Sequence, residues 1–297
     1  APKVHIGSAV RLTDEDCVGG SRLAHVVEDN MRIGELILGT LSRAPSSDAS
    51  AHTDPVYAPG EELAILRDAF ANFSALVAGK RVADFGCGTG EQAIALARDE
   101  GRDVVGIDAN PATIARANAR ATIARANARA AGQPLKGSVQ FLESVTPDLA
   151  GTFDVVISQN AMEHFADPAS IVALMARLVR PGGVMLVTFG PPWYAPFGSH
   201  MQYFCKVPWL NLLFSERTVM NVRARYRRDG ARRYVDVESG LNRMSLAKFE
   251  RVIAHAGVQA KHRHYACVKG LDFLAKVPVV RELFVNQVSC VLAPSPR

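Results

Sequence analysis

The sequence predicts an α/β fold, a doubly wound and mostly parallel sheet. Three observations lead to this prediction. Between residues 80 and 190, short apolar runs alternate with segments of helical apolar spacing. The first apolar run breaks into a glycine-rich turn, and two later helices begin at an Asn-Pro or an Asp-Pro pair. Strands that alternate with helices in this way are typical of parallel sheets built from βαβ units.

The first strand and its turn occupy residues 82–91, with the sequence Val-Ala-Asp-Phe-Gly-Cys-Gly-Thr-Gly-Glu. Glycines at alternate positions allow a sharp turn and leave no Cβ between the backbone and a ligand. The helix that follows begins with unpaired N–H groups. The dinucleotide-binding pattern has a third glycine where this chain has Glu91. A carboxylate there would repel a pyrophosphate, so Glu91 favours a nucleotide-like ligand with a positive centre.

The second strand starts at Asp103 and is followed by an acid, Asp108. The acid lies about twenty residues after the glycines, the spacing expected of a ribose-binding carboxylate. Such a side chain projects from the strand end over the ligand crevice and can accept hydrogen bonds from both ribose hydroxyls. Asn110 is expected to cap the next helix, and Pro111 to occupy its first position.

The helix after Pro111 contains a repeat, because residues 112–120 recur without change as residues 121–129. Nine residues rotate an α-helix by about 900°, so the two copies face opposite sides. Only one of Ile114 and Ile123 can therefore face the sheet squarely. We interpret the repeat as a local tandem duplication, which needs no ligand to explain it.

The other elements follow from apolar periodicity and from helix start signals. Asp167 and Pro168 are expected to start a helix that Arg180–Gly183 ends. The remaining predictions are helices over Val26–Leu41, Glu61–Leu76 and Ser245–Ala256, and strands over Val139–Leu142, Phe153–Ser158, Val184–Phe189, Val258–Val268 and Phe284–Leu292.

Several motifs occur in a fixed order: the glycine turn, the strand-end acid, Phe-Asp-Val-Val at 153–156, Glu-His-Phe at 163–165 and Arg-Pro-Gly-Gly at 180–183. Over roughly residues 80–190 this order resembles the class I S-adenosylmethionine-dependent methyltransferases. The resemblance implies a Rossmann-like methyltransferase fold whose last strand is antiparallel, and S-adenosylmethionine as the cofactor. The residues that it implies as cofactor-binding are Asp84, Gly86, Cys87, Gly88, Gly90, Asp108, Ala109, Glu143, Ser144 and Gln159.

The chain divides into four predicted segments. Residues 1–60 form an N-terminal helical and mobile segment, and residues 61–190 the S-adenosylmethionine-binding core. Residues 191–243 hold both tryptophans and the arginine-rich stretch 223–233, and we interpret them as a lid inserted over the substrate site. Residues 244–297 complete the core sheet. Tyr57, just before the first core helix, is a candidate to reach the cofactor.

His164 is the predicted catalytic residue, as a general base. It follows the fourth strand at the carboxyl end of the sheet, where ligands bind in open α/β sheets. A base is needed only when the methyl acceptor is a hydroxyl or a protonated amine, and the alternative is that His164 fixes the start of a helix. His200, in the insertion, is a second candidate without positional support.

A metal is not expected at this site. The Glu163-His164 pair resembles that of quinone-pathway O-methyltransferases, some of which bind a divalent metal through two acids and a histidine. Here Asn160 stands where the earlier acid would be.

Charge and cysteine content restrict the function further. A net charge of +5 is compatible with anionic partners but too small to indicate nucleic acid by itself. Five scattered cysteines without CxxC spacing argue against a disulfide framework or zinc site and favour a reducing, cytoplasmic location. No run is long enough to span a bilayer.

We therefore predict a methyltransferase with a small-molecule acceptor. Three alternatives remain open on the sequence. One is a nucleic-acid methyltransferase that uses the arginines of 223–233 on phosphates. The others are a nucleotide-binding oxidoreductase, against which Glu91 argues, and a non-catalytic S-adenosylmethionine-binding protein.

Overall fold

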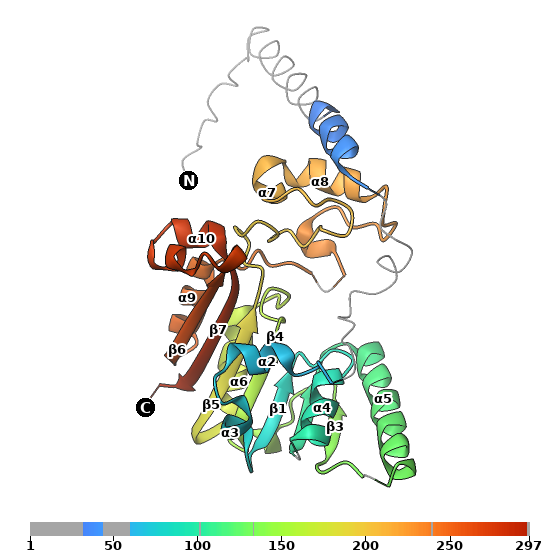
Figure 1. Cartoon of the computed structure of the whole chain (residues 1–297), viewed down its shortest axis with the longest axis vertical. Coiled ribbons are helices and arrows are strands. Elements are labelled where there is room, and N and C mark those ends of the chain that lie inside the picture. Colours follow the sequence, from blue (N-terminus) through green and yellow to red (C-terminus); the bar gives the residue numbers. More distant parts are fainter. Residues whose placement is uncertain (1–31, 44–59, 101, 133, 239, 296–297) are drawn as a thin grey trace, which may run out of the picture.

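The computed structural model describes residues 32–43 and 60–295, apart from residues 101, 133 and 239. In this part of the chain the structure has one seven-stranded sheet with the order β3-β2-β1-β4-β5-β7-β6 (Figure 1). Its strands are β1 (Arg81–Phe85), β2 (Asp103–Ile107), β3 (Val139–Leu142), β4 (Phe153–Gln159), β5 (Val179–Phe189), β6 (Val258–Cys267) and β7 (Val285–Pro294).

Strand β1 lies inside the sheet, between β2 and β4, and is parallel to both. Residues 82–85 are buried, and all of them except Asp84 are apolar, as expected for a strand inside a parallel sheet. The chain proceeds from β1 outward to β2 and β3 and then returns to β4 on the other side of β1. This reversal creates a crevice at the carboxyl ends of β1 and β4, the usual ligand position in such sheets.

The last strand, β7, is antiparallel to its neighbours β5 and β6 and lies next to the edge strand β6. The predicted fold class, with its mostly parallel sheet and antiparallel last strand, is therefore confirmed. Helices cover both faces of the sheet, and each face has its own apolar cluster. The longer core helices are α4 (Glu91–Asp99), α5 (Pro111–Ala130), α6 (Pro168–Leu178) and α9 (Leu246–His255).

Two helix starts agree with the sequence prediction. The side chain of Asn110 accepts hydrogen bonds from the backbone amides of Ala112 and Thr113 at the start of α5. The Asp167 side chain accepts one from the amide of Ser170 at the start of α6. In both helices proline occupies the first turn, where its missing N–H is not needed.

Two predicted boundaries were wrong. The helix expected over Glu61–Leu76 is two short helices, α2 (Ala64–Ala69) and α3 (Phe73–Val77), because Asn72 between them has a left-handed backbone with φ 60°. Arg180–Gly183 does not end α6. Instead, α6 ends at Leu178, Val179 is already extended, and β5 runs through these residues. Pairing of Val179 with Phe153 of β4 accounts for this longer strand.

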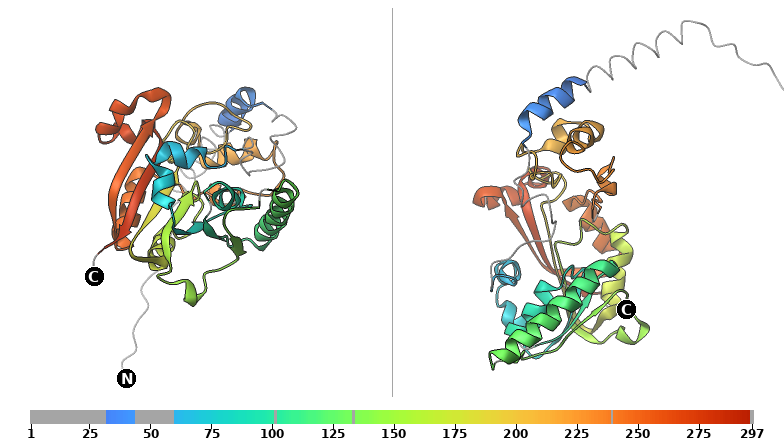
Figure 2. Two further views of the ribbon diagram at one scale, coloured as in Figure 1. Left: turned by 60° about the horizontal axis from the view of Figure 1, so that its bottom comes forward. Right: turned by 90° about the vertical axis from the view of Figure 1, so that its right-hand side faces the viewer.

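Helix α5 contains both copies of the nine-residue repeat in one uninterrupted helix. Ile114 is only 4% exposed and packs in the core, whereas Ile123 is 60% exposed. The prediction that only one isoleucine faces the sheet is therefore confirmed. The second copy forms the C-terminal half of α5, which is much longer than α4 and α6 (Figure 2).

We expect deletion of residues 121–129 to leave a folded protein that binds S-adenosylhomocysteine. The shortened α5 would have 11 residues, as many as α6, and would keep Ile114 in the core. The deletion removes the buried Ala121 and the hydrogen bond from Arg125 to the carbonyl of Val139. We therefore expect a loss of only about 1–3 kcal/mol of unfolding free energy, measured by chemical denaturation. A non-cooperative transition would contradict the duplication hypothesis.

Residues 191–243 form a separate layer beside the carboxyl ends of β1 to β4 (Figures 1 and 2). Their helices are α7 (Leu210–Leu213), α8 (Glu216–Arg223) and η2 (Tyr234–Asp236). An apolar cluster inside this layer includes Trp193, whose ring packs at right angles to Tyr234 with centroids 4.9 Å apart, and Leu38. Leu38 belongs to a helix at residues 32–41, the described end of the helix predicted over Val26–Leu41.

The short elements η3 (Val268–Gly270), η4 (Asp272–Lys276) and α10 (Val280–Phe284) connect β6 to β7. Tyr57 and most of the segment at residues 44–60 lie outside the described residues. None of the helices that the structure describes has the length and apolar character to cross a bilayer.

Candidate functional site

A cavity of about 990 Å³ lies between the carboxyl ends of β1 to β4 and the layer formed by residues 191–243. Most of the site residues named from the sequence contribute to its wall, although they come from four different strand ends. These residues are Asp84, Gly86, Cys87, Gly88, Asp108, Ala109, Glu143, Ser144, Gln159 and His164.

The glycine turn after β1 forms a cradle in this wall. Gly86 and Gly88 have φ angles of 77° and 52°, which glycine adopts without strain. A Cβ at Gly88 would meet no atom within 4 Å, so its backbone is open to a ligand. The Gly88 amide donates to Oδ2 of Asp108 over 3.1 Å, and the Asn110 amide donates to Oδ1 over 2.9 Å. These bonds fix the Asp108 carboxylate beside the turn.

Asp84 places a second carboxyl group in the wall, with only 2% of the residue exposed. The Gln92 amide group donates to Oδ1 over 2.8 Å, while Oδ2 is buried without a hydrogen-bond partner among the described residues. Burial raises the pKa of Asp84 to about 7, against the opposing effect of the Gln92 hydrogen bond. A buried carboxyl oxygen without a partner suits a positively charged ligand group. Sequence analysis missed Gln92, which carries no recognisable motif.

Gly90 differs from the other predicted cofactor residues because it does not line the cavity. A Cβ there would lie 2.5 Å from the ring of Phe141 on β3, and its φ is 79°. The position therefore requires glycine so that the start of α4 can pack against β3. Glu91 does line the cavity, and its carboxylate pairs with Arg120 of α5.

The turn after β4 carries Glu163 and His164 and is held by the end of the 191–243 layer. The Asn242 side chain donates to the carbonyls of Met162 and Phe165, each over 2.8 Å, and the Asn242 amide donates to the carbonyl of Glu163. Nδ1 of His164 lies 2.7 Å from the carbonyl oxygen of Gly240. Backbone contacts from a distant segment thus fix the orientation of the His164 ring.

His200 lies opposite His164, with ring centroids 6.0 Å apart, and both rings line the cavity. Nε2 of His200 is 3.3 Å from the carbonyl oxygen of Pro191. Burial, together with the neighbouring His164, lowers the pKa of His200 to about 4, so this ring is neutral at pH 7. Glu163 is 4% exposed, and burial raises the pKa of its carboxyl group to about 7. The structure therefore places His200 at the cavity opposite His164, a position that the sequence did not indicate.

The arginine-rich stretch 223–233 contributes Arg223 and Arg227 to the cavity wall, and several of its arginines are paired with acids. Arg223 is 2% exposed and binds Asp229 through two hydrogen bonds of 2.7 and 2.5 Å. Arg227 lies 3.5 Å from Glu238, and Arg233 lies 2.8 Å from Asp236. Acids of the same layer therefore neutralise the charges of these three arginines. The run of basic residues in the sequence did not indicate these ion pairs.

The remaining wall residues that sequence analysis missed are mostly apolar or aromatic. They include Phe165, Ile171, Leu174, Met201, Tyr203 and Leu241. The two tryptophans of the layer do not line the cavity. Trp193 packs against Tyr234, and Trp209 packs against Phe284 of α10.

An open glycine cradle, an acid that is fixed beside it and an unsatisfied buried acid fit S-adenosylmethionine, a nucleoside with a positively charged sulfur and an ammonium group. Fold and site together place the chain in the structural class of the S-adenosylmethionine-dependent methyltransferases. Residues 60–259, more than half of the chain, match a protein family described as a methyltransferase domain. The chain belongs to this family.

Similar proteins carry the name ubiquinone biosynthesis O-methyltransferase. One from Acinetobacter baumannii strain AYE is 40% identical over 107 residues, which is 36% of this chain and 42% of the relative. One from Sodalis glossinidius is 41% identical over 107 residues, which is 35% of this chain and 39% of the relative. The match thus spans less than half the length of these relatives.

Among solved structures, magnesium protoporphyrin IX methyltransferase from Synechocystis PCC 6803 is similar to this chain, and the similarity covers 82% of this chain and 90% of that one. The sequence identity is 14% and the TM-score is 0.45. The fold assignment follows from the strand order of the sheet.

Proposed function

We propose that the enzyme methylates a hydroxyl oxygen of a small organic molecule. One observation carries this proposal: a single cavity is lined by the strand ends that carry His164 and the predicted cofactor residues, and by Met201 and Tyr203 of the 191–243 layer. Donor and acceptor can therefore be held in one cavity, which lowers the entropic cost of a reaction between two molecules.

Oxygen is the acceptor atom that the site suits best. A hydroxyl must lose its proton as it attacks, and a positioned imidazole can accept that proton. The carbonyl of Gly240 can only accept a hydrogen bond, so Nδ1 of His164 carries the proton of the neutral ring and Nε2 carries its lone pair. We propose that Nε2 takes the hydroxyl proton while the oxygen electron pair forms the bond to the methyl carbon. S-adenosylmethionine supplies the methyl group on a positive sulfur, which keeps the electron pair of the broken C–S bond.

A small acceptor is supported by the layer at residues 191–243, which we propose to act as a lid. It contributes Met201, Tyr203 and Leu241 to the cavity wall. A nucleic-acid substrate would need arginines available for phosphates. The compensation of Arg223, Arg227 and Arg233 by neighbouring acids counts against that alternative. The names of the similar O-methyltransferases support oxygen as the acceptor atom.

We also propose that the enzyme works in a reducing compartment such as the cytoplasm. Cys87, Cys205, Cys267 and Cys290 are buried and free in the described part of the chain, and burial raises the pKa of the Cys290 thiol to about 12. These thiols pack in the interior and form no disulfide framework. Cys17 lies outside the described residues.

Two measurements test the proposed function. Calorimetric titration is expected to show binding of S-adenosylhomocysteine and none of NAD. Incubation with methyl-labelled S-adenosylmethionine is expected to transfer label to hydroxyl compounds from a panel of small phenols and catechols, and none to total RNA. Label in RNA, with binding that weakens steeply as salt rises, would contradict the small-molecule proposal. Cofactor binding without transfer to any acceptor would favour a non-catalytic binding protein.

A further inference from the structure

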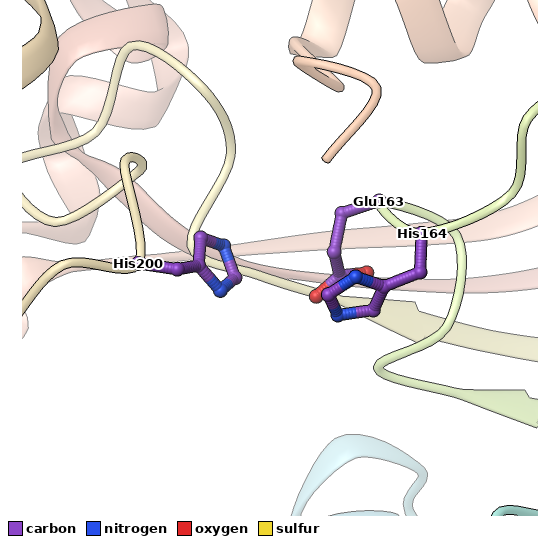
Figure 3. A group of neighbouring side chains, drawn as sticks. All are labelled: Glu163, His164 and His200. Atoms are coloured by element: carbon purple, nitrogen blue, oxygen red, sulfur yellow. The ribbon is translucent and has the colours of Figure 1, made fainter. Parts of the chain in front are cut away.

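Glu163, His164 and His200 form a cluster of potential metal ligands at the junction between the core and the 191–243 layer (Figure 3). One ligand atom from each residue lies within 4.8 Å of the other two. Figure 3 shows Glu163 and His164 together, with His200 facing them from its own segment. The cluster combines two imidazoles with one carboxylate, and it borders the cavity through both rings.

The carboxyl group of Glu163 is buried with an unsatisfied oxygen. Backbone amides of Glu163 and Gly190 hydrogen-bond to this group. Its Oε2 atom is buried and has no hydrogen-bond partner among the residues that the structure describes. A buried carboxylate is costly unless it is paired with a positive charge or coordinates a metal. A cation between Glu163 and the two rings would provide that charge.

Both histidines are oriented as metal ligands usually are. Carbonyl oxygens accept hydrogen bonds from Nδ1 of His164 and from Nε2 of His200, at 2.7 and 3.3 Å. In each neutral ring the lone pair then resides on the other nitrogen, Nε2 of His164 and Nδ1 of His200. A backbone carbonyl that binds the second ring N–H is a common means of fixing the tautomer of a metal-binding histidine.

The backbone at His200 is unusual as well. Its φ is 56°, in the left-handed region that non-glycine residues rarely adopt. Such conformations cost about 1–3 kcal/mol and persist where surrounding contacts enforce them, often at functional sites. Here the strained residue is His200, which carries the second ring, and thus the third ligand, into the cluster.

We propose that Glu163, His164 and His200 bind a divalent first-row transition-metal ion, and that Zn²⁺ fits best. Two histidines with one glutamate, and one open position, are a known ligand set of catalytic zinc, whereas Mg²⁺ prefers oxygen ligands. Ligand atoms around tetrahedral zinc lie about 3.3 Å apart for bonds of about 2.0–2.1 Å. A shift of the His200 ring by about 1–2 Å would therefore close the site. From the sequence we expected no metal because Asn160 replaces the second acid. In the proposed site, His200 takes the place of that acid as the third ligand.

The role of the metal follows from the position of the cluster and rests on the proposed function. His164 and His200 both line the cavity, so an ion held between them would lie beside an acceptor in that cavity. A divalent cation lowers the pKa of a hydroxyl that it binds. The hydroxyl proton would then leave to solvent, and the oxygen electron pair would form the bond to the methyl carbon. His164 would act as a metal ligand in place of a proton acceptor. The metal would also connect the 191–243 layer to the core.

The test is a titration of the purified chain of 297 residues, stripped with a chelator, with Zn²⁺, Co²⁺ and Mg²⁺. We expect one tight Zn²⁺ site, a visible Co²⁺ spectrum of tetrahedral type, and far weaker Mg²⁺ binding. Glu163→Gln and His200→Asn should each weaken Zn²⁺ binding at least about 100-fold, because each removes one of three ligands. Asparagine tolerates the left-handed backbone at position 200, so this variant tests the ring rather than the fold.

His255→Asn is the matched control, because His255 is an exposed histidine on α9 outside the cluster. It should leave the Zn²⁺ site unchanged. S-adenosylhomocysteine binding, measured on each variant, reports folding and cofactor binding separately from the metal. A wild-type protein without a stoichiometric Zn²⁺ site, or equal Zn²⁺ affinity in wild type and His200→Asn, would overturn the metal site. Neither result would affect the proposed function, which the methyl-transfer assay tests alone.

Discussion

Replacing Asp108 by alanine is expected to weaken S-adenosylhomocysteine binding by about 1–3 kcal/mol, a factor of roughly 5 to 150. The carboxylate accepts from the amides of Gly88 and Asn110 and is thereby held beside the glycine turn. Alanine would leave the ribose hydroxyls without their charged acceptor. It would also leave the Gly88 amide without its present partner. The first loss acts only on the bound state, and the second leaves the glycine turn less fixed before the ligand binds, so calorimetry should show a higher dissociation constant at unchanged stoichiometry.

Asp148→Ala provides the control for this experiment. Asp148 is an exposed acid on η1 (Pro147–Leu149) and does not line the cavity. Its replacement should leave affinity unchanged. Thermal melting of both variants without ligand establishes that they are folded. If Asp108→Ala binds S-adenosylhomocysteine as tightly as the wild type, the assignment of Asp108 to the ribose is wrong.

Replacing His164 by alanine is expected to reduce kcat by a factor of about 10² to 10⁴, the usual contribution of a positioned proton acceptor. The kcat of this variant should also fall if the His164 ring holds a metal that activates the hydroxyl. Affinity for S-adenosylhomocysteine should change little, because Asp108 and the glycine turn, which are the predicted cofactor-binding groups, stay intact. Single-turnover methyl transfer at saturating cofactor, with the best hydroxyl acceptor, measures the chemical step.

Two further variants separate chemistry from structure at this position. His164→Gln retains an N–H group able to donate to the carbonyl of Gly240, but it offers no basic nitrogen. It should therefore be as inactive as His164→Ala while melting closer to the wild type. His255→Ala, the exposed histidine of α9, should retain full activity. Wild-type kcat in both His164 variants would leave the ring with only the structural role of holding Gly240.

The range of the interactions that form each element explains where the predicted and the observed structure differ. Elements encoded in a few adjacent residues were predicted well, such as the β1 turn and the two Asn/Asp-Pro helix starts. The wrong boundaries depended on longer-range effects. Helix α2 stops short because Asn72 adopts a left-handed conformation, and β5 starts early because Val179 pairs with β4. Gly90 appeared to serve a ligand, but its neighbour is Phe141, about fifty residues further along the chain.

The sequence alone indicated the fold class and the residues that the strand ends bring to the cavity wall. Glycines in a turn, and acids at the ends of successive strands, are local features that a parallel sheet necessarily brings to one edge. The acceptor end depended on the tertiary structure. His200 faces His164, and Gly240 and Asn242 fix the turn after β4, only because the 191–243 layer folds back over the sheet. No periodicity encodes such contacts, since packing between distant segments decides them. The ligand cluster of Glu163, His164 and His200 could be recognised only in the folded chain.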